Sequence, residues 1–138
     1  MATQAGELGV DSVLAKFVFR NSELRPDGRV KSRNLVPRAG EALSVTDIDG
    51  LEDDQICAHG RKYVDNPAID RDSIGYCKYP ISGLSDISIT PDYDNSPPRH
   101  VSLYFPDDLA KRKEAALLLE RQAIKCNESN RPYFVQFA

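Results

Sequence analysis

The 138-residue sequence predicts an α+β fold, with a small antiparallel or mixed sheet and one or two helices packed on one face. Three observations support this class. The hydrophobic fraction of 41% and the charged fraction of 28% are ordinary for a globular protein. Short β-branched and aromatic runs alternate with turn residues, and one long helical pattern follows them. The length predicts a single domain spanning residues 1–138.

The first predicted strand covers residues 13–19, an apolar run with Lys16 near its centre. Residues 1–10 precede it and are expected to fray. Residues 20–42 contain several prolines and glycines, which predict a long basic loop. Loops of this length within a compact domain are uncommon and often functional.

A half-buried strand is predicted at 43–48, where apolar and polar residues alternate. A helix follows at 51–64, with three acidic residues in its first turn and two basic residues near its end. Both charge positions suit the helix dipole.

Three further strands are predicted at 74–81, 87–90 and 100–105. Pro80 and Pro91 place two of them at a sheet edge or at a strand end, because proline cannot donate to the ladder.

The strongest helical pattern runs over 107–125, and 131–138 can add a last short strand. The residues predicted on the buried side of that helix are Leu109, Ala116, Leu117, Ala123 and Ile124.

The three cysteines, Cys57, Cys77 and Cys126, form no CxxC pair, and their odd number does not suit a disulfide framework. Structural zinc needs about four clustered ligands, and only His59 lies near Cys57 in the sequence. We therefore expect reduced thiols, no metal and no cofactor.

Neither a membrane span nor a secretory signal is expected. The sequence has no apolar run of about 18 residues. Its first ten residues lack a basic start and an apolar stretch. We expect a cytoplasmic protein.

The net charge of −3 conceals a basic segment. Residues 16–38 hold seven bases and two acids, a net charge of +5, and an acidic stretch follows at 41–54. Such a split can steer an oppositely charged partner. A protein partner is favoured, nucleic acid is the second class, and a homo-oligomer stays open. The candidate binding residues are Arg20, Arg25, Arg29, Lys31, Arg33, Arg38, Arg99 and His100.

The segment His100–Leu103 is similar to the H-x-[ST]-x-hydrophobic signature of two-histidine phosphoesterases. Those enzymes need two such motifs, because one imidazole acts as acid and the other as base. The only other histidine, His59, has no hydroxyl residue two positions on. Phosphate-binding glycine loops and a nucleophile elbow are also absent from the sequence. No catalytic residue is assigned.

Several short motifs resemble a group of small bacterial proteins to which no activity is assigned. They are Leu43-Ser44-Val45, Gly50-Leu51 opening an acidic helix, Arg99-His100-Val101, and Pro106-Asp107 before a helix rich in Lys, Ala and Leu. The resemblance covers roughly residues 13–125. It implies a bacterial, cytoplasmic, single-domain protein.

The functional expectation is a non-enzymatic binding or accessory subunit of a bacterial multi-protein system, which contacts its partner through the basic loop. The alternative is a small enzyme acting on a nucleotide or phosphate ester near Arg99, His100 and Ser102. A pocket that gathers His100 with loop arginines would favour the enzyme, and a flat basic surface would favour binding.

Overall fold

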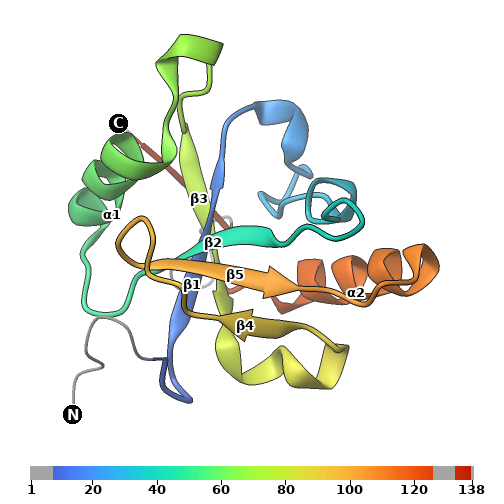
Figure 1. Ribbon diagram of the computed structural model, residues 1–138. Coiled ribbons are helices and arrows are strands. Elements are labelled where there is room, and N and C mark those ends of the chain that lie inside the picture. The colour runs from blue at the N-terminus through green and yellow to red at the C-terminus, as the bar shows by residue number, and fades with distance from the viewer. Residues whose placement is uncertain (1–7, 126–132, 138) are drawn as a thin grey trace.

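A computed structural model describes residues 8–125 and 133–137 of the chain. One antiparallel sheet holds six strands in the order β4-β5-β2-β1-β3-β6 (Figure 1). Their bounds are Val13–Val18 (β1), Leu43–Asp47 (β2), Gly75–Pro80 (β3), Thr90–Asp92 (β4), His100–Tyr104 (β5) and Phe134–Gln136 (β6). With helices α1 (Asp53–His59) and α2 (Leu109–Gln122), this confirms the predicted α+β class.

The two sheet faces carry separate cores, because successive strand residues point to opposite sides. Leu14 and Val18 of β1 join a large cluster that includes Ala115, Ala116 and Leu119 of α2. Ala15 and Phe17 belong to a smaller cluster with Ile56 of α1 and Tyr76 of β3. The helices thus cover different faces rather than sharing one.

Strand β1 is paired very unequally with its two neighbours. It keeps register with β3 over six residues, from Val13 to Val18. With β2 it shares two register pairs, Leu14 with Asp47 and Ala15 with Thr46. From Lys16 onward β1 and β2 separate, and Figure 1 shows them crossing rather than running side by side. This separation positions the site described below.

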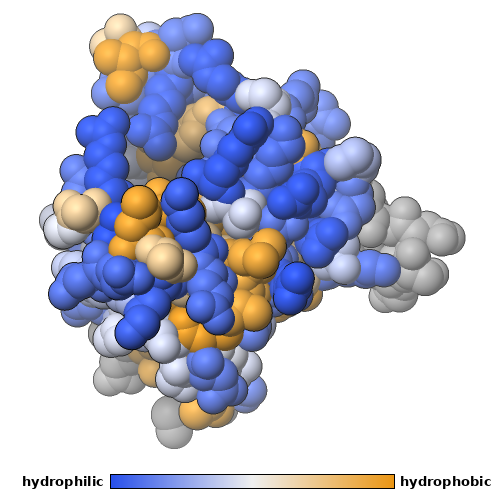
Figure 2. Space-filling view, turned by 90° about the vertical axis from the view of Figure 1, so that its right-hand side faces the viewer, coloured by the Kyte–Doolittle hydropathy of each residue, from blue (hydrophilic) through white to orange (hydrophobic). Residues whose placement is uncertain are grey.

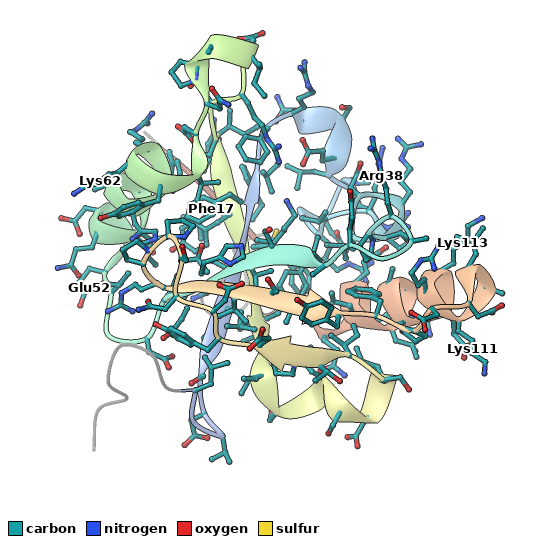
Figure 3. All side chains as sticks on the ribbon, in the orientation of Figure 1. Phe17, Arg38, Glu52, Lys62, Lys111 and Lys113 are labelled. Atoms are coloured by element: carbon teal, nitrogen blue, oxygen red, sulfur yellow. The ribbon has the colours of Figure 1, made fainter. Side chains whose placement is uncertain are left out.

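Helix α1 continues into a π-helical turn at Gly60–Val64, within the range predicted as one helix. The N–H of Asp65 donates to the carbonyl oxygen of Gly60 at 2.8 Å, a bond between residues five apart. A Cβ on Gly60 would lie 2.5 Å from the ring of Phe17. The absence of a side chain at Gly60 therefore lets the helix reach the sheet. Figure 3 shows Phe17 between α1 and the strands.

Helix α2 turns a different side toward the core from the side that was predicted. Its buried residues are Arg112, Ala115, Ala116, Leu119 and Glu120, at helical spacing on one side. Ala116 is confirmed as buried, but Leu109 and Leu117 are 51% and 39% exposed, so their assignment to the core was wrong. The reason is that buried arginine and glutamate carry part of the inner face, which hydrophobicity alone misses. Figure 2 shows the side of the molecule that bears α2 as mainly hydrophilic, with separate apolar patches.

One predicted strand is displaced. Residues Ser85–Ile87 form a short 3-10 helix, and β4 begins only at Thr90. The positive φ of 62° at Ser88 ends the helical turn. β4 is an edge strand, the position in a sheet where proline is tolerated, as expected for Pro91. The position of Pro80 at the end of β3 also agrees with its predicted role.

Across the described residues, neither helix has the length and apolar character needed to cross a membrane.

Candidate functional site

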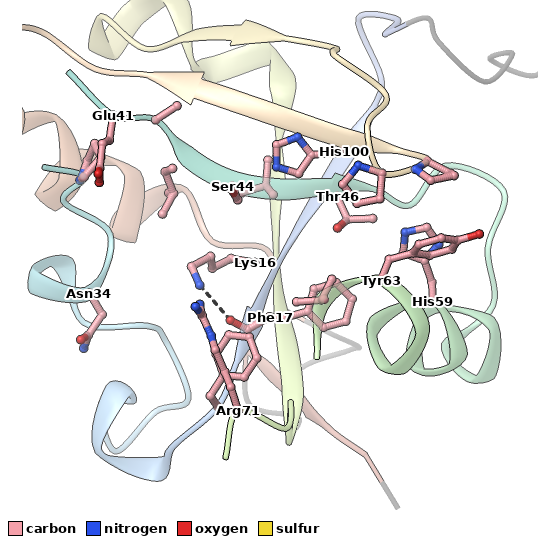
Figure 4. A pocket seen from close by; sticks show the side chains of 18 residues that line it. Lys16, Phe17, Asn34, Glu41, Ser44, Thr46, His59, Tyr63, Arg71 and His100 are labelled. Carbon is pink, nitrogen blue, oxygen red and sulfur yellow. Dashed lines mark hydrogen bonds between the residues drawn. The ribbon is translucent and has the colours of Figure 1, made fainter. Parts of the chain in front are cut away.

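A pocket of about 540 Å³ opens where β1 and β2 separate (Figure 4). Its size lies within the range of small-molecule sites, roughly 300–1,000 Å³. Phe17 and Lys16 of β1 form its floor, with Ser44 and Thr46 of β2 beside them. The basic loop supplies the wall on one side, and the π-helical turn supplies the wall on the other.

The ammonium group of Lys16 projects into this pocket and is only lightly held. Its Nζ donates to the carbonyl oxygen of Phe17 at 3.0 Å. Among the described residues it forms no ion pair. Burial lowers the pKa of Lys16, the charge of Glu23 acts against this, and the positive charge of Arg71 lowers it further. The fold therefore keeps a cation where its charged form is disfavoured.

Arg71 approaches Lys16 from the other side of the pocket. Its Cζ lies 4.3 Å from the ring centroid of Phe19, and the Nζ of Lys16 lies 5.6 Å from the same centroid. Within the described ranges Arg71 also has no carboxylate partner. Figure 4 shows the two cationic side chains meeting near the middle of the site. Two like charges that form no ion pair among the described residues attract an anion.

A second pocket of about 300 Å³ adjoins the first. Both are lined by Lys16, Phe19, Asn34 and Arg71. The pair Lys16–Arg71 thus lies at the junction of two hollows rather than at the closed end of one.

His100 lies on the β2–β5 side of the larger pocket and is bound to Asp94. Its Nδ1 is 2.5 Å from Oδ1 of Asp94, and Ser102 Oγ donates to Oδ2 of the same carboxylate at 2.7 Å. Desolvation raises the pKa of Asp94, but hydrogen bonds from Ser102 and His100 outweigh it, so the net shift is downward. Asp94 thus engages Nδ1 of His100 and orients its ring.

His59 and Tyr63 line the pocket beside Pro98 and Arg99, which precede β5, and their ring centroids are 4.7 Å apart. Burial lowers the pKa of His59, and the charge of Arg99 lowers it further. Residues 59 and 100 are far apart in the sequence, yet both histidines line one pocket. The sequence gives no sign of this proximity, because His59 lacks the hydroxyl residue of the phosphoesterase motif.

Two of the candidate arginines are tied to α2. Arg25 bonds through Nε and Nη2 to the carboxylate of Glu120, and the Nη1 of Arg29 lies 3.9 Å from Oε2 of Glu120. The backbone N–H of Ser32 donates to Glu120 at 2.8 Å. Arg29 also bonds Asp27 at 2.7 Å. These charges anchor the basic loop to the helix.

The remaining candidate binding residues lie at three different places in the structure. Arg99 has a φ of 68° and donates from Nη1 to the carbonyl oxygens of Asp47 and Asp49, which fixes the turn before β5. Arg20 lines the smaller pocket. The three bases Lys31, Arg33 and Arg38 belong to no ion pair among the described residues, and Arg33 and Arg38 are exposed. Figure 3 shows Arg38 directed outward.

The loop thus brings Asn34, Pro37 and Glu41 to the larger pocket, but none of its arginines. Sequence reasoning missed Lys16, Arg71 and Tyr63 as site residues. One signal for Lys16 was visible, since a lone lysine interrupts an otherwise apolar strand. Arg71 gave none, because it lies in a polar segment between elements.

In residues 8–125 and 133–137, no three His, Cys, Asp or Glu side chains gather closely enough to hold a metal ion. Cys57 is a free thiol, the Sγ of the buried Cys77 donates to the carbonyl oxygen of Gly28 at 3.3 Å, and Cys126 lies outside the described residues. Comparisons with protein-family models, curated proteins and solved structures find no match to this chain.

Proposed function

We propose that this chain is a non-enzymatic binding protein whose pocket between β1 and β2 holds the anionic group of a small ligand. One observation carries the proposal: Lys16 and Arg71 meet at the pocket without a carboxylate partner among the described residues. Arg71 is exposed and adds a second positive charge beside Lys16, which is half-buried, and a half-buried charge normally requires a counter-charge. A phosphate or carboxylate ligand would supply it.

The surrounding groups suit such an anion. The guanidinium of Arg71 offers several donors in one plane, which match the oxygens of a phosphate or carboxylate. Lys16 offers a compact charge with donors beyond the one bonded to Phe17. Ser44 and Thr46 add hydroxyl groups on the β2 side.

The test is calorimetric titration with inorganic phosphate and with citrate, on the wild-type protein and on Lys16→Met. Binding by the wild type and a loss of at least tenfold in the variant support the proposal. Lys113→Met is the matched control, since Lys113 is exposed on α2 and faces neither pocket. Equal affinities of the wild type and Lys16→Met for every bound anion would contradict it.

A second candidate is the accessory-subunit role in a bacterial, cytoplasmic multi-protein system. Exposure of Arg33 and Arg38, without ion partners in the part of the chain that the structure describes, favours docking to an acidic protein. Arg25 and Arg29 contribute less to such a surface, since Glu120 already neutralises part of their charge. Reversal of Arg33 and Arg38 to glutamate should then slow association with the partner in a pull-down or kinetic assay.

The enzymatic alternative rests on Asp94 and His100. A carboxylate on Nδ1 fixes the tautomer of a histidine and stabilises its protonated form, which suits a general base. The same bonds also hold the β4–β5 loop, a structural role. A panel of phosphate esters separates the two: turnover that His100→Gln abolishes, in a variant that keeps its melting temperature, would establish the enzyme.

A further inference from the structure

The position of the cation pair narrows the class of ligand. We infer that the ligand is a phosphodiester flanked on both sides, of the size of a dinucleotide, with its phosphate on Lys16 and Arg71. This inference rests on the proposed function and specifies its ligand.

A terminal phosphate is best held at the closed end of a cavity, with the rest of the molecule extending one way. Here the hollows of about 540 and 300 Å³ meet at Lys16 and Arg71, which line both. An anion bound there has free space on two sides, so it is best placed in the interior of the ligand.

Acidic residues lie in both hollows: Glu41 lines the larger one, and Glu23 and Asp70 line the smaller one. They disfavour a negatively charged group at either end of the ligand. A phosphodiester carries one negative charge and presents neutral groups on each side. A phosphomonoester carries about 1.5 to 2 charges at neutral pH and leaves them at one end.

Tyr63 and His59 line the larger hollow with their ring centroids 4.7 Å apart, and Pro97 and Pro98 line the same hollow. Aromatic rings in such positions stack planar bases, and a stacked base contributes about 1–3 kcal/mol by alanine substitution. Figure 4 shows these rings at one end, with Lys16 and Arg71 between them and Asn34.

The experiment compares four probes by calorimetry: inorganic phosphate, adenosine 5′-monophosphate, the linear dinucleotide ApA and a ten-residue oligoadenylate. We expect ApA to bind at least tenfold more tightly than adenosine 5′-monophosphate. Arg71→Gln should weaken ApA at least tenfold. Arg121→Gln, an exposed arginine of α2, is its matched control and should change nothing.

The Tyr63→Ala variant tests whether a base on one side of the phosphate lies against Tyr63. It should weaken ApA by about five- to hundredfold, which is the stacking contribution, while leaving inorganic phosphate unchanged. The matched control is Tyr104→Ala, because Tyr104 is 48% exposed on β5 and lines neither pocket. Tighter binding of the oligomer than of ApA would identify a nucleic-acid strand as the source, and equal binding would identify a small molecule. Both support the phosphodiester.

Two results overturn the inference. If adenosine 5′-monophosphate binds as tightly as ApA, the anion is terminal, and the proposed function survives without the diester. If ApA does not bind while inorganic phosphate or citrate binds in a Lys16-dependent way, the ligand belongs to another class. Failure of the proposed function is a different result, in which Lys16→Met changes the binding of none of the anions.

Discussion

Two groups of cations in this protein behave differently. Arg25 and Arg29 surround the buried carboxylate of Glu120, which also accepts from the backbone of Ser32. Lys16 and Arg71 meet beside a hollow, where no acid pairs with either among the described residues. The comparison separates charges that are ion-paired within the fold from charges that form no ion pair among the described residues, although all but Arg71 lie in one basic stretch of the sequence.

The pKa values reflect the same contrast. Desolvation raises the pKa of Glu120, but the hydrogen bonds from Arg25 and Ser32 outweigh it and lower the pKa overall. The pKa of Lys16 is lowered by burial, so its charge is destabilised in place. The ion-paired cluster around Glu120 holds loop 20–42 against α2. Lys16 and Arg71, which form no ion pair among the described residues, line the pocket instead.

The largest expected effect on the free energy of unfolding is in the hydrophobic core that α2 covers. Leu119→Ala should cost about 2–5 kcal/mol of unfolding free energy, because Leu119 is fully buried on α2. Leu117→Ala is the matched control on the same helix and should cost well under half of that, since Leu117 is 39% exposed. Urea denaturation measures both. A larger loss for Leu117 than for Leu119 would contradict the observed phase of α2.

The next largest effect on the free energy of unfolding is expected at Glu120, whose carboxylate binds Arg25, Arg29 and the backbone of Ser32. Glu120→Gln should cost about 2 kcal/mol, because it removes the charge that accepts bonds from Arg25 and Ser32. Glu114→Gln, an exposed position on α2, should have little effect. Anion binding at the pocket should be unchanged in both variants. A Glu120→Gln protein as stable as wild type would show that this cluster contributes nothing to the fold.

The same residue gives a pH dependence. Since the folded-state pKa of Glu120 lies below its ordinary value of 4.5, its stabilising contribution is present above that value. It is lost as the pH falls through the lowered pKa. The stability difference between wild type and Glu120→Gln should therefore shrink on acidification below about pH 4.5, as measured by melting temperature across pH. A difference that grows in acid would reverse the sign of the shift.

A smaller change in the free energy of unfolding, of opposite sign, is expected at Lys16, which forms no ion pair among the described residues. Lys16→Met should leave stability unchanged or raise it by about 1 kcal/mol, because a partly buried cation is replaced by an apolar chain. As the pH rises toward 10.5, the wild type should gain stability relative to the variant, since the folded state releases the Lys16 proton before the unfolded state does. Thermal melts at neutral and alkaline pH measure both differences. A loss of several kcal/mol in Lys16→Met would assign Lys16 to the fold instead.

The smallest effect on stability is expected on the exposed part of the basic loop. Reversal of Arg33 and Arg38 to glutamate should change the unfolding free energy by less than about 0.5 kcal/mol. Both side chains are exposed, so the loop anchor at Glu120 should persist. A melting curve checks this, and a marked drop would show that these bases contribute to the fold.

Much of the fold could be predicted because local patterns decide it. The strands at 13–19, 43–48, 74–81 and 100–105 are confirmed within a residue or two, since alternation and proline positions mark them. The phase of α2 could not be predicted, because its inner face includes Arg112 and Glu120. Arg112 donates to the carbonyl oxygen of Asp107, just before the helix, and Glu120 binds Arg25 of the distant basic loop.

The site was harder to predict than the fold. Only His100 and Arg20 of the eight candidate residues line either pocket. The pocket exists because β1 and β2 separate after two register pairs, and no pattern within either strand predicts where a pairing stops. Whether the eight residues bind a partner stays a prediction.

Gly60 has an ordinary helical backbone, with φ of −60°, so its own conformation does not require glycine. The requirement comes from Phe17, whose ring occupies the space of a Cβ at that position. Phe17 in turn lines the pocket and supplies the carbonyl oxygen that holds Lys16. Among evolutionary variants, residues 60 and 17 should therefore change together, a bulkier residue at one accompanying a smaller residue at the other. Natural selection for ligand binding would then constrain residue 60, although the ligand does not contact it.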